Sequence, residues 1–507
     1  MSKPISLKKY FVALSKDSLV YGLGNVVLKL LAIVTAPILT RLFIPAQYGV
    51  LSLIASIISF LSLFMMFGMD TSVFLRVNEF KNEKKTVVSS GFWFLVTWGV
   101  FLSGICILFS RQIATAAFHN PSTAIYFTLA FSTAFFTLLI NYVKTIYRLE
   151  FKAKTFALTT AIGAVIITSL SIGLIHVWGL FGYFFGTLIG TIITFLITIY
   201  LIRENFQFSW KWAHAKDMAI VGMMLVPASL SYFVFDLSDR FFINHYWNLN
   251  LLGLYAMAIN VTSVLPFFSM ALSRAWLPMI FNLHSEEKEV FDEFVPRIFV
   301  YYLAFFMILA VGISFFGLEI LKVLTVSKYY AAASAIGPLS LAMVFSATVQ
   351  ITSVGIYLTK KTKKIAICSG LAAIINTVCN FLLIPKFGII GASWATALSY
   401  FFLTGAYLWY SQRLVYIKIN WTKVSKIIIM GLLVVILMPL TWKYSFGLNF
   451  IIKIVEMLVF LGLLPLIGVI EPSEINTIKK LFTGQFNKKH PSDEEEDVEA
   501  ENSPVLD

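Results

Sequence analysis

The sequence predicts an all-α protein that crosses a membrane many times, and two features of the chain lead to this prediction. Long apolar segments recur along its 507 residues, 59% of which are hydrophobic. A helix that crosses the hydrocarbon core of a bilayer needs about 20 apolar residues, and a soluble protein cannot hide so much apolar surface. Basic residues also gather in alternate gaps between these segments. We therefore expect a polytopic membrane protein with about 14 transmembrane helices.

The predicted transmembrane helices follow one another with loops between them. In chain order the segments span residues 17–39, 47–69, 88–109, 122–143, 156–176, 179–200, 218–238, 250–272, 298–317, 333–357, 365–384, 389–410, 424–440 and 451–470. The first segment is longer than the apolar region of a signal peptide and carries Lys29 in its middle. We therefore expect it to be a retained helix.

The basic residues predict the orientation of the chain. Thirty of the 39 Lys and Arg residues lie in the amino-terminal tail, in every second loop after it and in the carboxyl-terminal tail. The opposite loops hold eight, among them Arg41, Arg240 and Lys453, and the last one is Lys29. Loops rich in Lys and Arg remain in the cytoplasm, so we expect both termini to be cytoplasmic. The basic residues are dispersed among many short loops, which argues against a nucleic-acid partner.

Two pairs of similar segments indicate an internal duplication. The segment 179–187, which opens the sixth helix, has the same Gly spacing as 388–396, which opens the twelfth. Residues 40–51, around the end of the first helix, resemble 239–255 around the end of the seventh. Small residues at these spacings give a flat helix face that permits close packing. Equivalent positions lie six helices apart, which is typical of transporters built from two parallel repeats.

These observations divide the chain into four parts. We expect two pseudo-symmetric six-helix lobes at residues 1–205 and 206–415, and two extra helices, the thirteenth and fourteenth, at 416–470. Residues 471–507 end in a polyacidic stretch without apolar periodicity. We interpret this part as a disordered, solvated cytoplasmic tail. The alternative is a docking tail for a basic partner.

The strongest candidate for a binding residue is a charge inside the first helix. Tyr21, Asn25 and Lys29 are spaced four residues apart and share one helix face. A lysine at the centre of a bilayer costs about 2.5 to 3.5 kcal/mol even on insertion scales, so it must face protein or water. Either Lys29 pairs with a carboxylate inside the bundle, or it binds an anionic substrate in a central cavity.

A second set of polar residues follows the seventh helix. Asp236 and Arg240 lie on one face with two further polar residues, and Arg41 occupies the equivalent outer position in the first repeat. We take Asp236, Arg240 and Arg41 as substrate-binding candidates. The alternative is that Asp236 and Arg240, four residues apart, only pair with each other. Smaller polar stripes, such as Asn376 with Asn380, favour hydrogen bonds between helices.

Two further charges occupy equivalent places at the predicted inner ends of the second and eighth helices. These are Asp70 and Arg274, which have opposite signs. Together they are a candidate cytoplasmic gate that closes when the two lobes approach each other. The alternative is two independent, solvated residues at helix ends.

The chain has none of the motifs that mark a metal site, a cofactor site or an enzyme active site. The three cysteines fall in apolar segments, the six histidines are scattered, and no phosphate-binding loop is present. We therefore predict no catalytic residues, no metal and no cofactor.

Several segments resemble the polysaccharide-transport branch of the multidrug/oligosaccharidyl-lipid/polysaccharide exporter superfamily. This branch includes O-antigen repeat-unit flippases, which serve lipopolysaccharide synthesis, and teichoic-acid-type exporters. The similar segments are residues 21–25, 36–42, 47–52, 67–71 and 376–396. The resemblance extends over residues 15–470 and leaves out the acidic tail.

The resemblance implies a flippase that works by alternating access in the bacterial cytoplasmic (inner) membrane. Its substrate would be a polyprenyl-diphosphate-linked oligosaccharide, moved from the cytoplasmic to the outer leaflet for cell-surface polysaccharide biosynthesis. Membrane lipids, a coupling ion and polysaccharide polymerase or assembly proteins are the other expected partners. Two alternatives remain: a cation-coupled multidrug antiporter of the same superfamily, and a non-transporting membrane scaffold of a polysaccharide assembly complex.

Overall fold

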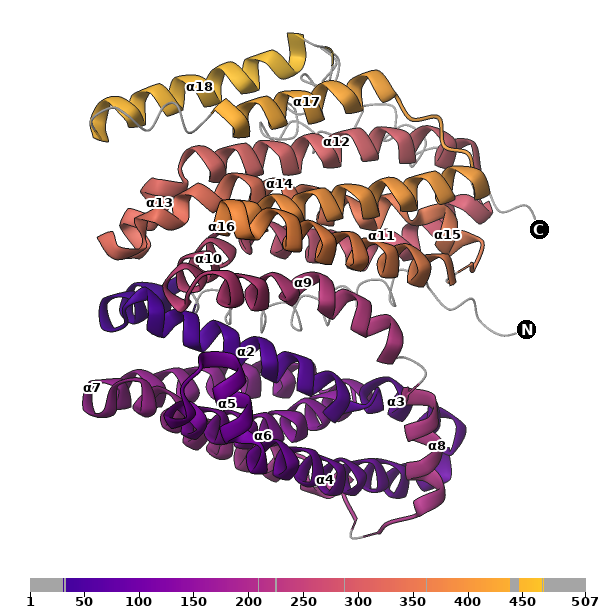
Figure 1. Ribbon diagram of the computed structural model, residues 1–507. Helices are drawn as coiled ribbons and strands as arrows, with labels where there is room; N and C mark the ends of the chain where they lie inside the picture. The colour runs from indigo at the N-terminus through magenta and orange to yellow at the C-terminus, as the bar shows by residue number, and fades with distance from the viewer. Residues whose placement is uncertain are drawn as a thin grey trace, which may run out of the picture.

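The computed structural model describes residues 31, 33–207, 209–223, 226–286, 288–361, 363–437, 446–466 and 468. Within these residues every regular element is a helix (Figure 1). The helices lie in two bundles, one above the other in Figure 1, with the amino-terminal helices in the lower bundle. The predicted all-α, polytopic fold class is confirmed.

Six of the α-helices in the described part of the chain form the first bundle. They are α2 (Pro45–Met66), α3 (Met69–Glu79), α4 (Lys84–Leu108), α5 (Ser110–Phe118), α6 (Ala124–Leu149) and α7 (Ala153–Tyr200). A shorter helix, Ile33–Leu42, precedes them. The helix α8 (Trp212–Met223) follows the predicted lobe boundary at residue 205, yet it packs against α3 and α4 of the first bundle.

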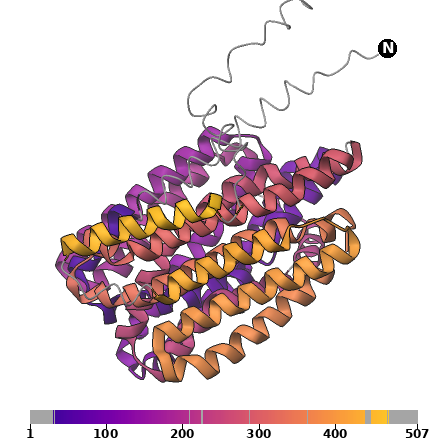
Figure 2. The same cartoon turned by 90° about the horizontal axis from the view of Figure 1, so that it is seen from above.

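The second bundle begins after α8. Its helices are α9 (Val226–Tyr246), α10 (Leu249–Thr262), α11 (Val264–Glu286), α12 (Lys288–Phe315), α13 (Gly317–Leu324), α14 (Ala333–Thr352), α15 (Val354–Leu358) and α16 (Lys363–Leu414). Two more helices, α17 (Trp421–Leu437) and α18 (Phe446–Leu466), lie along one edge of this bundle next to α12 (Figures 1 and 2).

Eight helices in the described part of the chain are long and apolar enough to cross a membrane. Two of them, α7 with 48 residues and α16 with 52, are about twice the length that a bilayer requires. Each is interrupted by one residue with non-helical dihedral angles, Gly179 in α7 and Gly388 in α16. Each therefore supplies two of the predicted transmembrane segments.

The interruptions turn α7 and α16 into tight helical hairpins. Gly179 has φ 56° and ψ −132°, and Gly388 has φ 56° and ψ −129°, a conformation that is open to glycine. After each turn the chain runs back against itself. A Cβ atom on Gly182 would lie 2.0 Å from the carbonyl oxygen of Leu174, and one on Gly391 would lie 2.4 Å from that of Leu383. The glycine spacing that the two segments share thus builds the same hairpin twice.

The last helix, α18, is joined to the second bundle by a buried ion pair. The Nζ atom of Lys453 lies 2.9 Å and 2.8 Å from the two carboxylate oxygens of Glu319 on α13. The Lys453 side chain is 1% exposed and that of Glu319 is 11% exposed. The charge count assigns Lys453 to the outer loops, whereas the predicted segment 451–470 includes it. The structure agrees with the segment, because α18 begins at Phe446 and contains Lys453. The pair compensates the cost of placing these charges among apolar side chains.

The helix α8 is fixed to the first bundle by an ion-pair cluster near residue 83. The Glu83 carboxylate accepts hydrogen bonds from Lys211 Nζ at 2.8 Å and from His214 Nε2 at 2.9 Å. These bonds, that of Lys211 first, lower the pKa of Glu83 below its ordinary value. The cluster therefore ties the connection between the bundles to the end of α4.

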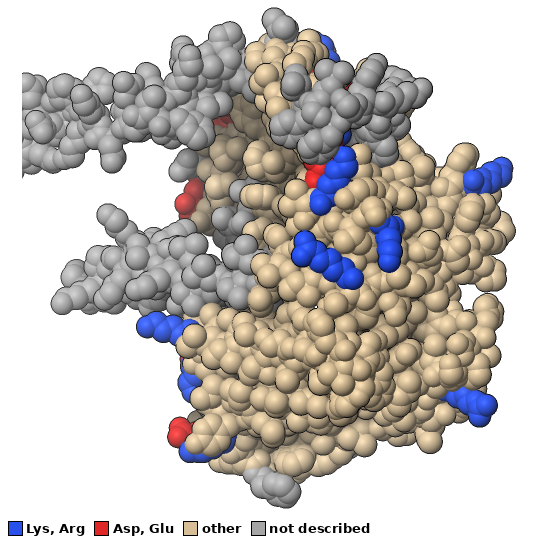
Figure 3. Space-filling model, turned by 90° about the vertical axis from the view of Figure 1, so that its left-hand side faces the viewer, with Lys and Arg blue, Asp and Glu red and all other residues tan. Residues whose placement is uncertain are grey.

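The end of the molecule that carries α13 and the Gly179 turn is the predicted outer end. Seen from this end, the described surface is mostly uncharged, with scattered Lys and Arg side chains (Figure 3). On the flanks many large apolar side chains are exposed, such as Leu196 on α7 and Phe381 on α16, at 57% and 58%. Such side chains suit contact with lipid rather than water.

Candidate functional site

The structure describes only part of the predicted substrate site. Tyr21, Asn25 and Lys29 lie outside the described residues. Asp236 is on α9, but its side chain is not among those described. The structure does place the side chains of Arg41 and Arg240, and it shows how the two bundles meet around the second of these.

The two bundles touch at the predicted outer end through equivalent helices of the two repeats. Gly49 on α2 faces Gly253 on α10 so closely that no Cβ atom fits between the backbones. A Cβ on Gly49 would lie 2.0 Å from the carbonyl oxygen of Leu249, and one on Gly253 would lie 1.8 Å from that of Pro45. The two glycines belong to the segments 40–51 and 239–255, which resemble each other in sequence, and the structure brings them together.

Hydrogen bonds surround this glycine contact. Asn260 Nδ2 on α10 donates to the hydroxyl of Tyr48 on α2 at 2.7 Å. The hydroxyl of Tyr329 donates to the backbone oxygen of Phe43 at 3.0 Å, and its ring lies edge-on to that of Tyr48. The outer ends of the bundles are therefore held together by both backbone packing and side-chain bonds.

Arg240 extends from the second bundle to the first at a position further from the predicted outer end than the glycine contact. It projects from α9, and its Nη1 atom donates to the hydroxyl of Ser56 on α2 at 2.8 Å. Ser56 lies about 16 Å along α2 from its outer end, at 1.5 Å per residue. The Arg240 Nε atom is buried and has no hydrogen-bond partner among the described residues. The guanidinium is thus a cation between the bundles with donor capacity to spare.

The residue before Arg240 is a buried carboxylate. Asp239 is 2% exposed and accepts a hydrogen bond from the hydroxyl of Tyr255 on α10. Its Oδ1 atom accepts the backbone N–H of Arg240 at 2.8 Å. The sequence pattern predicts Asp236 as the candidate and does not indicate that Asp239 is a buried polar centre. The only signal was the place of Asp239 beside Arg240 in the repeated segment.

A second polar cluster links α9 to α16. Ser238 Oγ donates to Asn376 Oδ1 at 2.8 Å, and Asn380 Nδ2 donates to Ser238 Oγ at 3.1 Å and to Asn376 Oδ1 at 2.9 Å. Both asparagines are fully buried. The two bonds to Ser238 join different helices, as expected for this pair, and the third lies within α16. Asn376 Nδ2 and Asn380 Oδ1 have no partner among the described residues, so the cluster retains one donor and one acceptor.

The remaining predicted residues lie away from this cluster. Arg41 is exposed, near the end of the helix Ile33–Leu42. Asp70 is in the first turn of α3, because α2 ends at Met66 and a left-handed turn at Phe67 and Gly68 separates the two helices. A carboxylate there is stabilised by the helix dipole.

Arg274 does not lie at a helix end as predicted. The helix α11 continues to Glu286, so Arg274 is inside it, and its side chain is not among those described. The gate pairing of Asp70 with Arg274 stays a prediction.

Comparison with known proteins identifies the family of the chain. Residues 38–333, more than half of the sequence, match the model of a family described as polysaccharide biosynthesis protein. The chain belongs to this family. The sequence resemblance to polysaccharide exporters is therefore confirmed.

Two curated proteins are similar to parts of this polysaccharide biosynthesis protein. An uncharacterized membrane protein of Methanocaldococcus jannaschii is 26% identical over 204 residues, which are 39% of this chain and 40% of the relative. A probable low-salt glycan biosynthesis flippase of Haloferax volcanii, Agl15, is 24% identical over 231 residues, which are 43% of this chain and 48% of the relative. The matches thus span less than half of each relative.

Solved structures of transporters share the fold. A lipid II flippase, MurJ, in an inward closed conformation has a TM-score of 0.70 at 18% identity, covering 88% of this chain and 98% of its own. A multidrug resistance transporter of the MOP superfamily in an inward-facing conformation has a TM-score of 0.64 at 15% identity, covering 76% and 93%. At these identities the likeness shows the fold, which is that of membrane transporters.

Proposed function

We propose that this protein is a flippase for polyprenyl-diphosphate-linked oligosaccharide repeat units, which it moves from the cytoplasmic to the outer leaflet for cell-surface polysaccharide biosynthesis. The observation that carries the proposal is the guanidinium of Arg240. It lies between the two bundles, it bridges to Ser56, and its Nε atom is buried without a hydrogen-bond partner among the described residues. A diphosphate offers the oxygen acceptors that this group lacks, and a planar guanidinium binds phosphate through paired hydrogen bonds.

The similar proteins support a lipid-linked saccharide as substrate. Agl15 is named as a probable glycan biosynthesis flippase, and MurJ is a lipid II flippase. Lys29, with Tyr21 and Asn25, remains our candidate for a second diphosphate contact, and Arg41 and Asp236 for contacts nearer the outer end. Membrane lipids are the expected surroundings, while a coupling ion and a polymerase or assembly protein are expected partners.

The contact between Gly49 and Gly253 supports alternating access. It closes the predicted outer end between equivalent helices of the two repeats, so substrate would enter from the cytoplasmic leaflet. We assign the six-helix lobes to residues 1–205 and 206–415. We assign the protein to the bacterial cytoplasmic (inner) membrane, with both termini in the cytoplasm. Separation of Gly49 from Gly253 would then open the outer end and release the saccharide.

The proposal is tested by measuring in which leaflet the lipid-linked saccharide accumulates. Removal of the protein should leave this lipid in the cytoplasmic leaflet, where a membrane-impermeant label added from outside does not reach it. Arg240→Ala should do the same at normal protein abundance, and Arg240→Lys should keep part of the transport because it keeps the charge. Arg111→Ala, at an exposed arginine on α5, is the matched control and should transport normally. Full transport by Arg240→Ala would refute the assigned role.

The second candidate is a cation-coupled multidrug antiporter, and the buried carboxylate of Asp239 favours it. An antiporter needs such a group to exchange a proton or a metal cation for a drug. Asp239 already has a hydrogen-bonded Tyr255 hydroxyl and a backbone N–H as partners, which suits a structural anchor equally well. Removal of an antiporter should raise the sensitivity of cells to cationic drugs and leave the leaflet distribution of the lipid-linked saccharide unchanged. A scaffold would change neither the drug sensitivity nor the leaflet distribution.

A further inference from the structure

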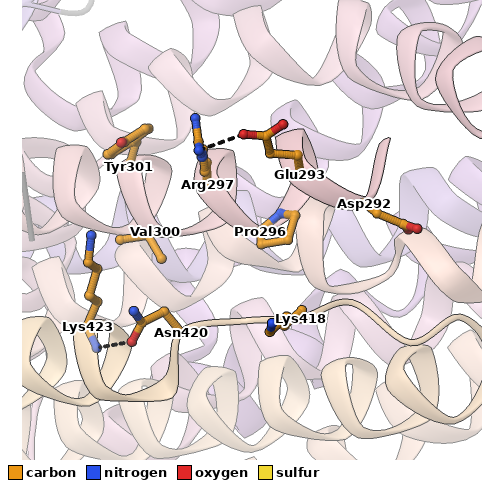
Figure 4. Close-up of a pocket in the computed structure, with 9 residues that line it drawn as sticks. All are labelled: Asp292, Glu293, Pro296, Arg297, Val300, Tyr301, Lys418, Asn420 and Lys423. Atoms are coloured by element: carbon orange, nitrogen blue, oxygen red, sulfur yellow. Dashed lines mark hydrogen bonds and ion pairs between the residues drawn. The ribbon is translucent and has the colours of Figure 1, made fainter. Parts of the chain in front are cut away.

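A cavity lies outside the bundle contact, where α12 meets the connection between α16 and α17. It has a volume of about 260 Å³. One side is formed by α12 and the other by the connection and the first turn of α17 (Figure 4). The connection belongs to a loop that the basic residues predict to be cytoplasmic.

The cavity is lined by charges of both signs with an excess of positive charge. Three cationic side chains and two carboxylates line it: Arg297, Lys418, Lys423, Asp292 and Glu293. Arg297 is neutralised by Glu293, at 2.6 Å from Nη2 to Oε1. The lining as a whole thus carries one more positive than negative charge, so the cavity suits a ligand with a single negative charge.

Lys418 is the cation best placed to bind such a ligand. It forms no ion pair among the described residues, and it is exposed. The start of α17 is already capped, since Asn420 Oδ1 accepts the backbone N–H of Lys423 at 3.1 Å. The attraction for an anion therefore rests on the lysine side chain rather than on the end of the helix.

Aromatic side chains place the cavity at the membrane surface. Tyr416 and Trp421 flank the connection and are 77% and 56% exposed. Exposed Tyr and Trp residues of membrane proteins are concentrated at the level of the lipid headgroups. Beyond Trp421 the exposed face of α17 is apolar, with Ile429 and Leu433 at 55% and 51%. An acyl chain attached to a group in the cavity would thus find an apolar surface next to it.

We propose that this cavity binds the phosphate of an anionic phosphodiester lipid of the cytoplasmic leaflet. Its volume is below the 300–1,000 Å³ of typical sites for drug-sized ligands, so it is too small for an oligosaccharide but suits a headgroup phosphate. Basic pockets between transmembrane helices on the cytoplasmic side bind anionic headgroups. The bound lipid would fasten α17 to α12. This proposal does not depend on the identity of the transported substrate.

The test measures lipid binding to the purified full-length protein. Phosphatidylglycerol, phosphatidylcholine and inorganic phosphate are titrated separately against the protein in detergent, and bound lipid is counted by native mass spectrometry alongside the melting temperature. We expect phosphatidylglycerol to bind and to raise the melting temperature, and the other two to have no such effect. An equal effect of inorganic phosphate would overturn the assignment to a lipid, and an equal effect of phosphatidylcholine would overturn the role of the charge.

Variants distinguish the cavity from general attraction to a basic surface. Lys418→Gln should weaken phosphatidylglycerol binding about five-fold, whereas Lys361→Gln, at an exposed lysine outside the cavity, should leave it unchanged. Asp292→Asn removes the competing carboxylate and should strengthen binding, a gain that misfolding does not imitate. Equal losses for both lysine variants, or no gain for Asp292→Asn, would overturn the proposal.

Discussion

The buried pair of Glu319 and Lys453 gives the sharpest prediction about stability. The Lys453 Nζ atom approaches both carboxylate oxygens, and its side chain is 1% exposed. At 2.8 Å and an effective dielectric constant of about 20, the Coulomb attraction is about 6 kcal/mol before the loss of hydration is counted. Most of that attraction offsets desolvation, so the net value of the intact pair is small.

Removing one partner is a different matter, because it leaves an uncompensated charge among apolar side chains. Lys453→Met should lower the free energy of unfolding by about 3–5 kcal/mol. The double variant Glu319→Leu with Lys453→Met replaces both charges by apolar groups and should regain most of that loss. Lys328→Met, at an exposed lysine on the same outer side, should change the free energy of unfolding by less than about 0.5 kcal/mol.

Thermal unfolding of the purified proteins in detergent, together with their abundance in the membrane, measures these effects. We expect a clearly lower melting temperature for Lys453→Met, a value near wild type for the double variant, and no change for the control. A wild-type melting temperature for Lys453→Met would refute the reasoning, because an unpaired carboxylate would then cost nothing. A double variant as unstable as the single one would show that side-chain shape, not charge, matters at this place.

Four other predictions concern the predicted gates, the substrate and the bundle connection. Gly253→Val should prevent closure of the outer contact, which cysteine cross-linking across that contact measures. At normal protein abundance it should also abolish transport in the leaflet assay. Lys29→Ala should abolish transport in the leaflet assay while the protein folds normally, and Lys29→Arg should retain a part. Charge reversal of both residues, Asp70→Arg with Arg274→Asp, should restore more transport than either single reversal; a double variant no better than the worse single one would refute the pairing. The pKa of Glu83 is lowered in the folded protein. The Glu83 carboxylate therefore stabilises the folded protein above pH 4.5, and this contribution is lost as the pH falls through the lowered pKa. In Glu83→Gln this pH dependence should vanish when the melting temperature is followed against pH.

The features that the sequence predicted well are those that neighbouring residues determine. Apolar length defined the transmembrane segments, and glycine spacing indicated close packing at the starts of the sixth and twelfth segments, where the structure has turns at Gly179 and Gly388. Both signals lie within about 20 residues of chain, the length of one helix. The similarity of segments 40–51 and 239–255 also rests on neighbouring residues, and the structure brings Gly49 and Gly253 of these segments together.

The features that the sequence missed depend on contacts between distant residues. Glu319 and Lys453 are separated by 134 positions, and neither is part of a motif. Asp239 is part of a buried polar centre because it accepts a hydrogen bond from Tyr255, which lies on another helix. Arg274 was placed at a helix end because hydropathy falls there, yet α11 continues to Glu286 beyond the apolar segment. Hydropathy locates the lipid-facing part of a helix, not the place where its backbone hydrogen bonding ends.

The same small-residue packing serves two purposes in this fold. In the hairpins, Gly182 lies against a residue only eight positions before it, so this contact is local to one hairpin. Gly49 and Gly253 belong to different bundles, and the side-chain bonds beside them are few, such as Tyr48 with Asn260. Each such bond contributes about 0.5–1.5 kcal/mol, which the binding energy of a diphosphate can balance. We therefore expect the contact within each hairpin to persist and the contact between the bundles to be the one that opens, which is the arrangement that the proposed alternating access requires.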